Sequence, residues 1–209
     1  MPVASLTNFT VPLPPGATNS GSGLLMPKLK YRFRATFINF GVTNPTTELT
    51  KQVADIKRPQ VNFNPITVDV YNSKVHLQGK PEWQDTQIHL RDDATGKVSQ
   101  LVGEQLQKQF DFLEQASAPS GINYKFSLIY EMLDGGNGTI TPNTLEAWEL
   151  DGCFISSADY GDMAYNSNDP VMIALTIKFD NAVQTTYNGA SGLGVGTRVS
   201  TQTPGTLSY

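Results

Sequence analysis

The sequence predicts a mainly β protein, built as one antiparallel sheet or barrel that carries one α-helix. Most of the segment 28–180 alternates apolar and polar residues with the period of two that is typical of a half-buried strand. A single stretch, 98–115, instead repeats its apolar residues at helical spacing. The 209 residues, of which 39% are hydrophobic, are enough for one sizeable core. We therefore expect one β domain with extensions rather than several domains.

The most regular strand pattern is 28–38. Its cations Lys28, Lys30, Arg32 and Arg34 alternate with apolar residues, so the pattern predicts a cationic face opposite a buried one. Further strand patterns cover 66–70, 75–77, 86–91, 124–130, 147–155 and 171–179. The first two of these flank a short polar connection, Tyr71, Asn72, Ser73 and Lys74, and predict a hairpin.

The helical stretch is amphipathic. Its apolar residues lie three or four positions apart: Val98, Val102, Leu106, Phe110 and Leu113. We expect Leu106, Phe110 and Leu113 to pack on the sheet, where burial of each contributes about 1.5 to 3 kcal/mol. Capping residues precede the stretch and helix-breaking residues follow it: Asp92, Asp93 or Thr95 before, and Pro119 and Gly121 after.

The two ends of the chain differ from its middle. Residues 1–27 carry no charged side chain and 183–209 carry only Arg198, while both ends are rich in Gly, Pro, Ser, Thr and Asn. The sequence therefore predicts an uncharged N-terminal arm (1–27), a β domain (28–182) and a C-terminal arm (183–209). The arms are either flexible tails or elements that become ordered against a neighbouring subunit, and their apolar residues favour the second interpretation.

Charge and cysteine content exclude several classes of protein. The chain has 15 Lys and Arg against 19 Asp and Glu, a net charge of -4, so we expect no bulk attraction to nucleic acid or anionic lipid. One cysteine, Cys153, cannot build a disulfide framework or a thiolate zinc site within one chain. No apolar run approaches the roughly 20 residues needed to span a bilayer, and 1–10 lack the cations of a signal peptide. We expect a soluble protein that is used inside a cell or particle.

Candidate catalytic and ligand-binding groups do not form a recognisable motif. His76 and His89 lie on strand patterns without a partner at metal-ligand spacing, and Cys153 reads as a small buried residue. The remaining candidates are an oxygen-rich stretch suited to a hard cation (159–169), a glycine run (192–196) and the possible acid/base pairs Glu131 with Asp134 or Glu146 with Glu149. Ordinary loop or sheet roles explain each of them. We expect no enzyme, cofactor or metal site.

Four segments of the chain follow one another in a characteristic order. A strand follows Pro27, a long hairpin (66–85) leads through Gly79 to Trp83 and Asp85, the helix comes next, and a final hairpin pattern covers 148–180. Over about 26–182, this order and spacing resemble the tail tube protein of contractile-tailed (myovirus-type) bacteriophages.

The resemblance implies a structural protein of the virion tail that is assembled in the cytoplasm of the bacterial host. Homohexameric rings would join their sheets into a continuous inner barrel and stack into a tube, the conduit for DNA ejection. Genomic DNA would pass through the lumen without specific binding, and the other partners would be the tail sheath, baseplate and tail terminator proteins, with no membrane.

Two groups of residues are expected to serve assembly. The hairpin residues Tyr71, Asn72, Ser73 and Lys74, with Trp83 and Asp85, would reach a neighbouring subunit or ring. The cations Lys28, Lys30, Arg32 and Arg34 would face the outer wall or pair with carboxylates of an adjacent chain, because a cationic lumen would retain DNA.

Other functions stay open at this point. The uncharged arms and an insertion-like segment, 135–143, allow a tube-initiating or terminating ring instead of the main tube subunit. The inner tube of a type VI secretion system or another injection system would share the fold. A carbohydrate- or receptor-binding β-sandwich, a different class, would use exposed aromatic residues: Trp83, Trp148, Tyr160 and Tyr165.

Overall fold

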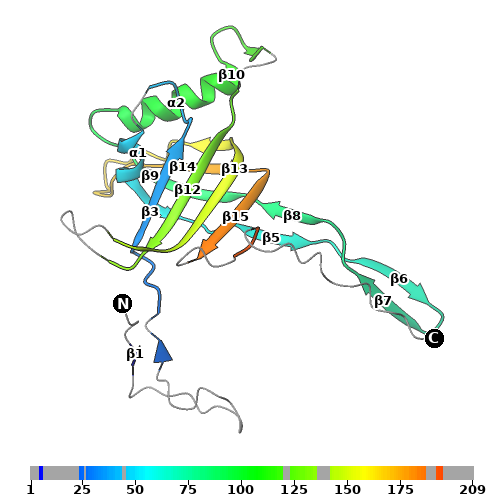
Figure 1. Cartoon of the computed structure of the whole chain (residues 1–209). Helices are drawn as coiled ribbons and strands as arrows, with labels where there is room; N and C mark the ends of the chain where they lie inside the picture. Colours follow the sequence, from blue (N-terminus) through cyan, green and yellow to red (C-terminus); the bar gives the residue numbers. More distant parts are fainter. Residues whose placement is uncertain are drawn as a thin grey trace.

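The computed structural model describes residues 5–6, 24–25, 27–43, 46–119, 123–135, 142–186 and 192–194. Its centre is a seven-stranded antiparallel sheet in the order β3-β12-β13-β14-β9-β4, with β15 also paired to β13 (Figure 1). The strands are β3 (Phe33–Ile38), β4 (Val53–Ile56), β9 (Thr86–Arg91), β12 (Phe126–Leu133), β13 (Thr144–Asp159), β14 (Met172–Lys178) and β15 (Asn181–Thr186). The predicted mainly β, antiparallel fold is therefore confirmed.

Strand β13 divides this sheet into two halves. The first part of its 16 residues pairs with β12 and β15, and the last part pairs with β14. The change of partner follows Gly152, which has a φ of 68° and where an added Cβ would lie 2.1 Å from Asp180 Oδ2. Only glycine fits this position. The chain thus has one half formed by β3, β12, β13 and β15, and another formed by β13, β14, β9 and β4.

The two halves and the helices share one core. Phe37 and Leu128 from the first half, Ile88 and Ile173 from the second, and Val102 from a helix all belong to one cluster of buried side chains. Phe40 packs edge-on against Phe126, with ring centroids 4.9 Å apart. Cys153 is buried in the same cluster, as its apolar neighbours in the sequence predict.

The structure has a second helix that the sequence pattern did not reveal. The predicted helix is α2 (Lys97–Gln109), and a shorter α1 (Thr47–Gln52) packs beside it and against β3. With six residues, α1 is too short to show an amphipathic period, and Leu49 is its only buried side chain. Helix α2 begins after Gly96, and Asp93 accepts a hydrogen bond from the Val98 amide.

Helix α2 ends at Gln109, so the expected extension to residue 115 is wrong. The chain continues as β10 (Phe110–Asp111), a turn, and β11 (Ala116–Ser117). The Asp111 carboxylate accepts hydrogen bonds from the Leu113 and Glu114 amides, which closes a local turn in place of helix. Leu113 is consequently 91% exposed instead of packed on the sheet.

The boundaries at both ends of the domain also differ from expectation. Strand β3 begins at Phe33 because the Leu29 carbonyl accepts a hydrogen bond from the Arg32 amide, which forms a turn before it. Strand β15 crosses the expected boundary after residue 182. Of the predicted arms, the structure describes the pair β1 (Ser5–Leu6) and β2 (Leu24–Leu25), residue 27, and residues 183–186 and 192–194. Most of both arms, and most of 135–143, lie outside the described residues.

A long two-stranded arm projects from the sheet (Figure 1). At its root, β5 (Gln60–Phe63) pairs with β8 (Pro81–Gln84); toward its tip, β6 (Ile66–Val70) pairs with β7 (Ser73–Leu77). The turn consists of Tyr71 and Asn72, and Tyr71 has a φ of 38°. The predicted hairpin is confirmed and is longer than the sequence suggested.

Candidate assembly surfaces

The outer part of the hairpin arm, β6 with β7, is an amphipathic ribbon. Cross-strand partners in an antiparallel pair point to the same face. One face carries Ile66 opposite Leu77 and Val68 opposite Val75, while the other carries Thr67 opposite His76 and Asp69 opposite Lys74. The apolar side chains, including Val70, are 41–56% exposed, so nothing in the described chain covers this face.

An exposed ribbon of this kind is poorly stable by itself. Two-stranded hairpins are marginal in water, and each apolar side chain that becomes covered contributes up to about 1.5 to 3 kcal/mol. The polar face adds a hydrogen bond of 3.2 Å between Thr67 Oγ1 and His76 Nδ1 and an ion pair of 3.5 Å between Lys74 and Asp69. The ribbon thus has one face suited to water and one suited to a partner.

The predicted hairpin residues occupy two different places. Tyr71, Asn72, Ser73 and Lys74 form the exposed tip of the arm. Trp83 instead lies at the root, where its ring stacks obliquely on Phe179 with centroids 5.5 Å apart and packs on the core. Asp85 follows it and is exposed. Trp83 therefore fastens the arm to the domain.

A second surface is the outward face of the half formed by β3, β12, β13 and β15. Its residues are aligned across the four strands in three rows on the side away from the core. The rows are Arg34–Glu131–Ala147–Thr185, Thr36–Ile129–Glu149–Val183 and Ile38–Ser127–Asp151–Asn181. We call this surface the open face.

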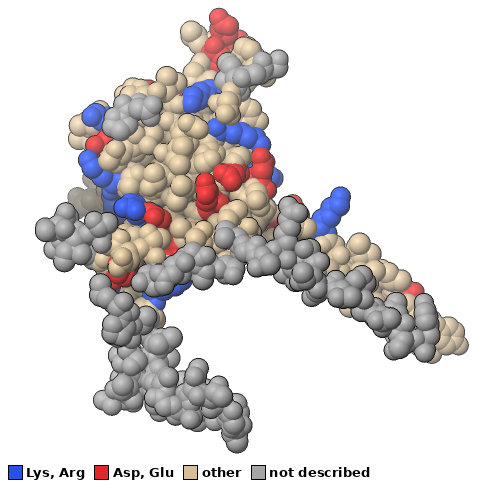
Figure 2. All heavy atoms as spheres, viewed as in Figure 1, with Lys and Arg blue, Asp and Glu red and all other residues tan. Residues whose placement is uncertain are grey.

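The open face is predominantly acidic. Within its three rows the carboxylates of Glu131, Glu149 and Asp151 outnumber one guanidinium, Arg34, and Figure 2 shows acidic side chains gathered over this part of the sheet. Arg34 Nε donates to Glu131 Oε2 over 2.8 Å, which neutralises the cation. The remaining charge of the rows is negative.

The outer strands of this half, β3 and β15, run in opposite directions, because each of the three steps between them is antiparallel. In the described ranges, no strand pairs with the outer side of either. Single hydrogen bonds touch them: Thr46 Oγ1 donates to the Phe37 carbonyl over 3.0 Å, and the Gln184 amide donates to the Leu193 carbonyl over 2.7 Å. Both strands thus offer edges for further pairing.

The four predicted cations do not share one strand face, since β3 starts after three of them. Arg34 alone belongs to the open face; Lys28 forms an ion pair with Glu146. Arg32 donates to the Asp134 carbonyl over 2.6 Å, and its guanidinium lies 5.5 Å from the centre of the Tyr31 ring. Lys30 is exposed at a cavity of about 790 Å³ between β3, β12 and β4. Their position relative to an outer wall stays a prediction.

Most of the groups considered for catalysis are engaged in contacts within the chain, and Glu149 is exposed. His89 Nδ1 lies 2.6 Å from Asp55 Oδ1, and Asp134 accepts hydrogen bonds from Asn143. Burial raises the pKa of the Cys153 thiol to about 12, which removes its thiolate at neutral pH. In the part of the chain that the structure describes, no group of three or more His, Cys, Asp or Glu is arranged to hold a metal ion.

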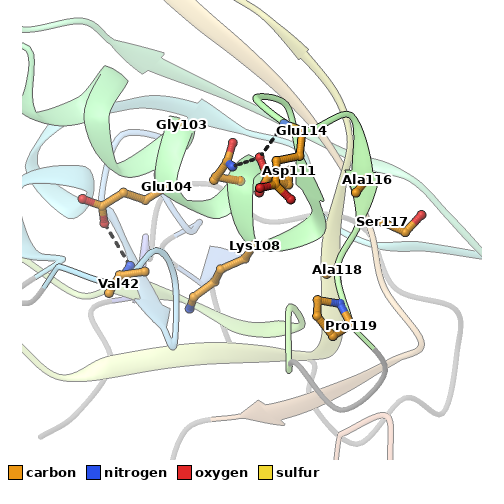
Figure 3. Close-up of a pocket in the computed structure, with 11 residues that line it drawn as sticks. Val42, Gly103, Glu104, Lys108, Asp111, Glu114, Ala116, Ser117, Ala118 and Pro119 are labelled. Atoms are coloured by element: carbon orange, nitrogen blue, oxygen red, sulfur yellow. Dashed lines mark hydrogen bonds between the residues drawn. The ribbon is translucent and has the colours of Figure 1, made fainter.

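A groove of about 570 Å³ lies between α2 and the turn that follows it (Figure 3). Its two central carboxylates hold backbone in place. Glu104 accepts hydrogen bonds from the Val42 and Thr43 amides, and Asp111 closes the turn described above. Glu104 and Asp111 are therefore occupied by hydrogen bonds to backbone amides.

Three solved structures contain chains with the same arrangement. A chain of the anti-feeding prophage baseplate matches with a TM-score of 0.56 and 13% identity, over 77% of this chain and 97% of that one. A chain of the sheath–tube complex of an extracellular contractile injection system (PVC) in its extended state gives 0.51 and 15%, over 77% and 92%. A chain of the tube-terminating cap of the anti-feeding prophage gives 0.53 and 13%, over 88% and 99%.

This chain has the contractile tail tube fold. The similarity in sequence is low, and no family model and no curated protein matches the sequence. The tail tube fold found in these structures belongs to mechanical assemblies: a tube with its sheath, a cap and a baseplate. None of the described helices is long and apolar enough to cross a membrane.

Proposed function

We propose that this protein is a structural subunit that forms stacked hexameric rings, the inner tube of a contractile phage tail and the conduit for DNA ejection. The observation that carries the proposal is a four-stranded half-sheet with two lightly covered edges of opposite direction. Pairing β15 of one copy with β3 of the next continues the antiparallel order, so repetition around an axis closes a barrel without edges. The single bond from Gln184 to Leu193 then gives way to the neighbour's strand.

The open face is the side of this sheet that can line the lumen, because the core occupies the other side. A lining with three carboxylates and one paired guanidinium per subunit repels phosphates, so a passing DNA duplex is not retained. Lys28, Lys30 and Arg32 precede β3, and we place them on the outer wall, toward a sheath, or against an adjacent chain. A rod structure with all four cationic groups unpaired and directed at the axis would overturn this placement.

The hairpin arm supplies the contact between subunits or rings. Its apolar ribbon face is exposed in the single chain, and covering it on a neighbour adds association energy to the pairing of β15 with β3. We assign Tyr71, Asn72, Ser73 and Lys74 to the contact itself, and Trp83 with Asp85 to the root that directs it.

The test is negative-stain electron microscopy of the purified protein. We expect rings or long hollow rods from the native sequence and none from a variant that lacks residues 71–74. The variant must keep the native circular dichroism spectrum, since the deleted turn lies far from the core. A variant that forms normal rods would refute the role of the arm, and a native protein that stays monomeric at high concentration would refute the tube itself.

A ring that initiates or terminates the tube is the second candidate. The tube-terminating cap match covers 88% of this chain, against 77% for the baseplate and sheath–tube matches. Such a ring would give single or double discs that stop the growth of rods of another subunit.

An injection-system tube would give the same rods as a phage tube, and the genes that neighbour this one would distinguish the two. A carbohydrate-binding module would bind a glycan array and form no rods.

A further inference from the structure

Glu146 is the one charged residue among the buried residues in the described ranges. It is 3% exposed and lies near the start of β13, on the core side of the sheet, opposite Met132. A buried carboxylate is unfavourable unless several donors satisfy it. The donors around Glu146 therefore show what the fold uses it for.

These donors come from parts of the chain that are far apart in sequence. Lys28 Nζ bonds to Oε2, while Trp148 Nε1 and Gln184 Nε2 donate to Oε1 over 2.6 and 2.9 Å. The guanidinium of Arg58 approaches Oε1 to 3.9 Å. Burial raises the pKa of the Glu146 carboxyl, but the bonds from Lys28 and Trp148 and the charges of Lys28 and Arg58 lower it below its ordinary value. The carboxylate is thus charged at neutral pH.

Two of the donors, Lys28 and Gln184, and the nearby cation Arg58 stand at the roots of extended elements. Lys28 belongs to the segment that leads from the N-terminal arm into β3, and Arg58 lies two residues before the hairpin arm begins at Gln60. Gln184 belongs to β15, and its backbone amide donates to the Leu193 carbonyl in the C-terminal segment. Without the carboxylate, Lys28 and Arg58 are left as like charges that line the same cavity as Tyr130.

We propose that Glu146 is a positioning residue that holds the roots of the N-terminal arm and the hairpin arm in one fixed relation, through Lys28 and Arg58. Its consequence for assembly rests on the tube function proposed above. A subunit in which the two arm roots are fixed relative to the sheet presents them to its neighbours in one geometry, so fewer conformations are lost when rings stack. A mere internal ion pair would stabilise the fold without linking the two roots.

The first measurement uses hydrogen exchange with mass spectrometry on the free subunit, so it does not depend on tube formation. In Glu146→Gln we expect exchange to become about tenfold faster in both 27–32 and 57–63, because one change removes the charge that bonds to Lys28 and attracts Arg58. Lys28→Ala should speed up exchange in 27–32 and Arg58→Ala in 57–63. Peptides from α2 should keep the native rate in all variants.

Glu131→Gln is the matched control. It removes a carboxylate that pairs with one cation, Arg34, on the open face and touches neither root, so exchange in both segments should stay native. If Glu146→Gln does not fold, Glu146→Asp keeps the charge but withdraws it from the donors, and the same pattern should appear with smaller amplitude. Loosening of one root alone, of neither, or equally throughout the core would overturn the proposal.

The second measurement is the subunit concentration at which rods appear in electron microscopy. We expect it to rise about tenfold for Glu146→Gln and to stay unchanged for Glu48→Gln, which removes an ion pair with Lys51 in α1, away from the open face and both roots. A shift in exchange with normal rod formation would refute the assembly role and leave the tube function standing. A native protein that forms no rods would refute the tube function, while the exchange result would still decide whether Glu146 links the roots.

Discussion

Replacing Glu104 with glutamine should reveal how strongly α2 is bound to the loop that follows β3. The Glu104 carboxylate accepts a hydrogen bond of 2.9 Å from the Val42 amide (Figure 3). It also accepts hydrogen bonds of 2.9 Å from the Thr43 amide, of 2.7 Å from Thr43 Oγ1 and of 2.9 Å from Gln100 Nε2. Glutamine keeps the size of the side chain but loses the charge and one of the two acceptor oxygens. The substitution therefore removes the interaction without opening a cavity.

The magnitude follows from the pKa of this group. Partial burial raises it, but the four hydrogen bonds lower it by more, from 4.5 to about 2. A shift of this size corresponds to about 3 kcal/mol at most. Because the carboxylate is still in contact with solvent, we expect Glu104→Gln to lower the free energy of unfolding by about 1 to 2 kcal/mol at pH 7.

The assay is urea denaturation of both proteins at a series of pH values. The folded pKa is below the unfolded one, so the contribution of Glu104 is complete above pH 4.5 and is lost as the pH falls through about 2. The difference between the proteins should shrink accordingly below pH 4.5. Glu48→Gln, which removes an exposed helix ion pair with Lys51, should change the stability by less than about 0.5 kcal/mol. A Glu104→Gln difference as small as this control, or one that does not change with pH, would refute the reasoning.

Two further predictions concern buried side chains. Tyr130→Phe should leave the free energy of unfolding unchanged or raise it by up to about 1 kcal/mol in urea denaturation. The reason is that the Tyr130 hydroxyl is buried and has no hydrogen-bond partner among the described residues. A loss of more than about 1 kcal/mol would instead show that the hydroxyl has a partner. Cys153 should not react with a disulfide reagent in the native protein and should react at once in urea, since it is fully buried and its thiol pKa is raised to about 12; fast stoichiometric labelling of the native protein would contradict this.

The strands were predictable because alternation reflects the difference between a buried and an exposed sheet face. β9, β12 and β14 lie where the pattern places them. The same alternation misled at 28–32, since a turn closed by a backbone hydrogen bond carries no periodic signal. Phe110 and Leu113 continued the helical spacing, yet the Asp111 side chain ends the helix with bonds that a hydrophobic pattern does not record.

The polar anchors of the fold could not be predicted from local patterns. Gln105 lies between the apolar positions of the helical pattern, yet it is buried and bridges the Gly41 amide and the Tyr124 carbonyl. Glu146 was considered only as one of a pair of acids, whereas its ion-pair partner Lys28 lies 118 residues away. Such contacts depend on which segments the completed sheet brings together. The order of the segments along the chain was enough to suggest the resemblance to tail tube proteins. The two sheet edges that would join the subunits, β3 and β15, could be identified only from the strand order and directions in the structure.

The long strand β13 gives the domain a mechanical property. The same sixteen residues run through both halves of the sheet. The two halves are therefore connected by continuous peptide backbone as well as by packed side chains. Displacing one half of the sheet along the other therefore strains the strand hydrogen bonds of β13 as well as the contacts between packed apolar side chains. In the tube proposed above, an axial load on the open face of a subunit would therefore pass into the half formed by β13, β14, β9 and β4 through the peptide backbone of β13 as well as through side-chain packing.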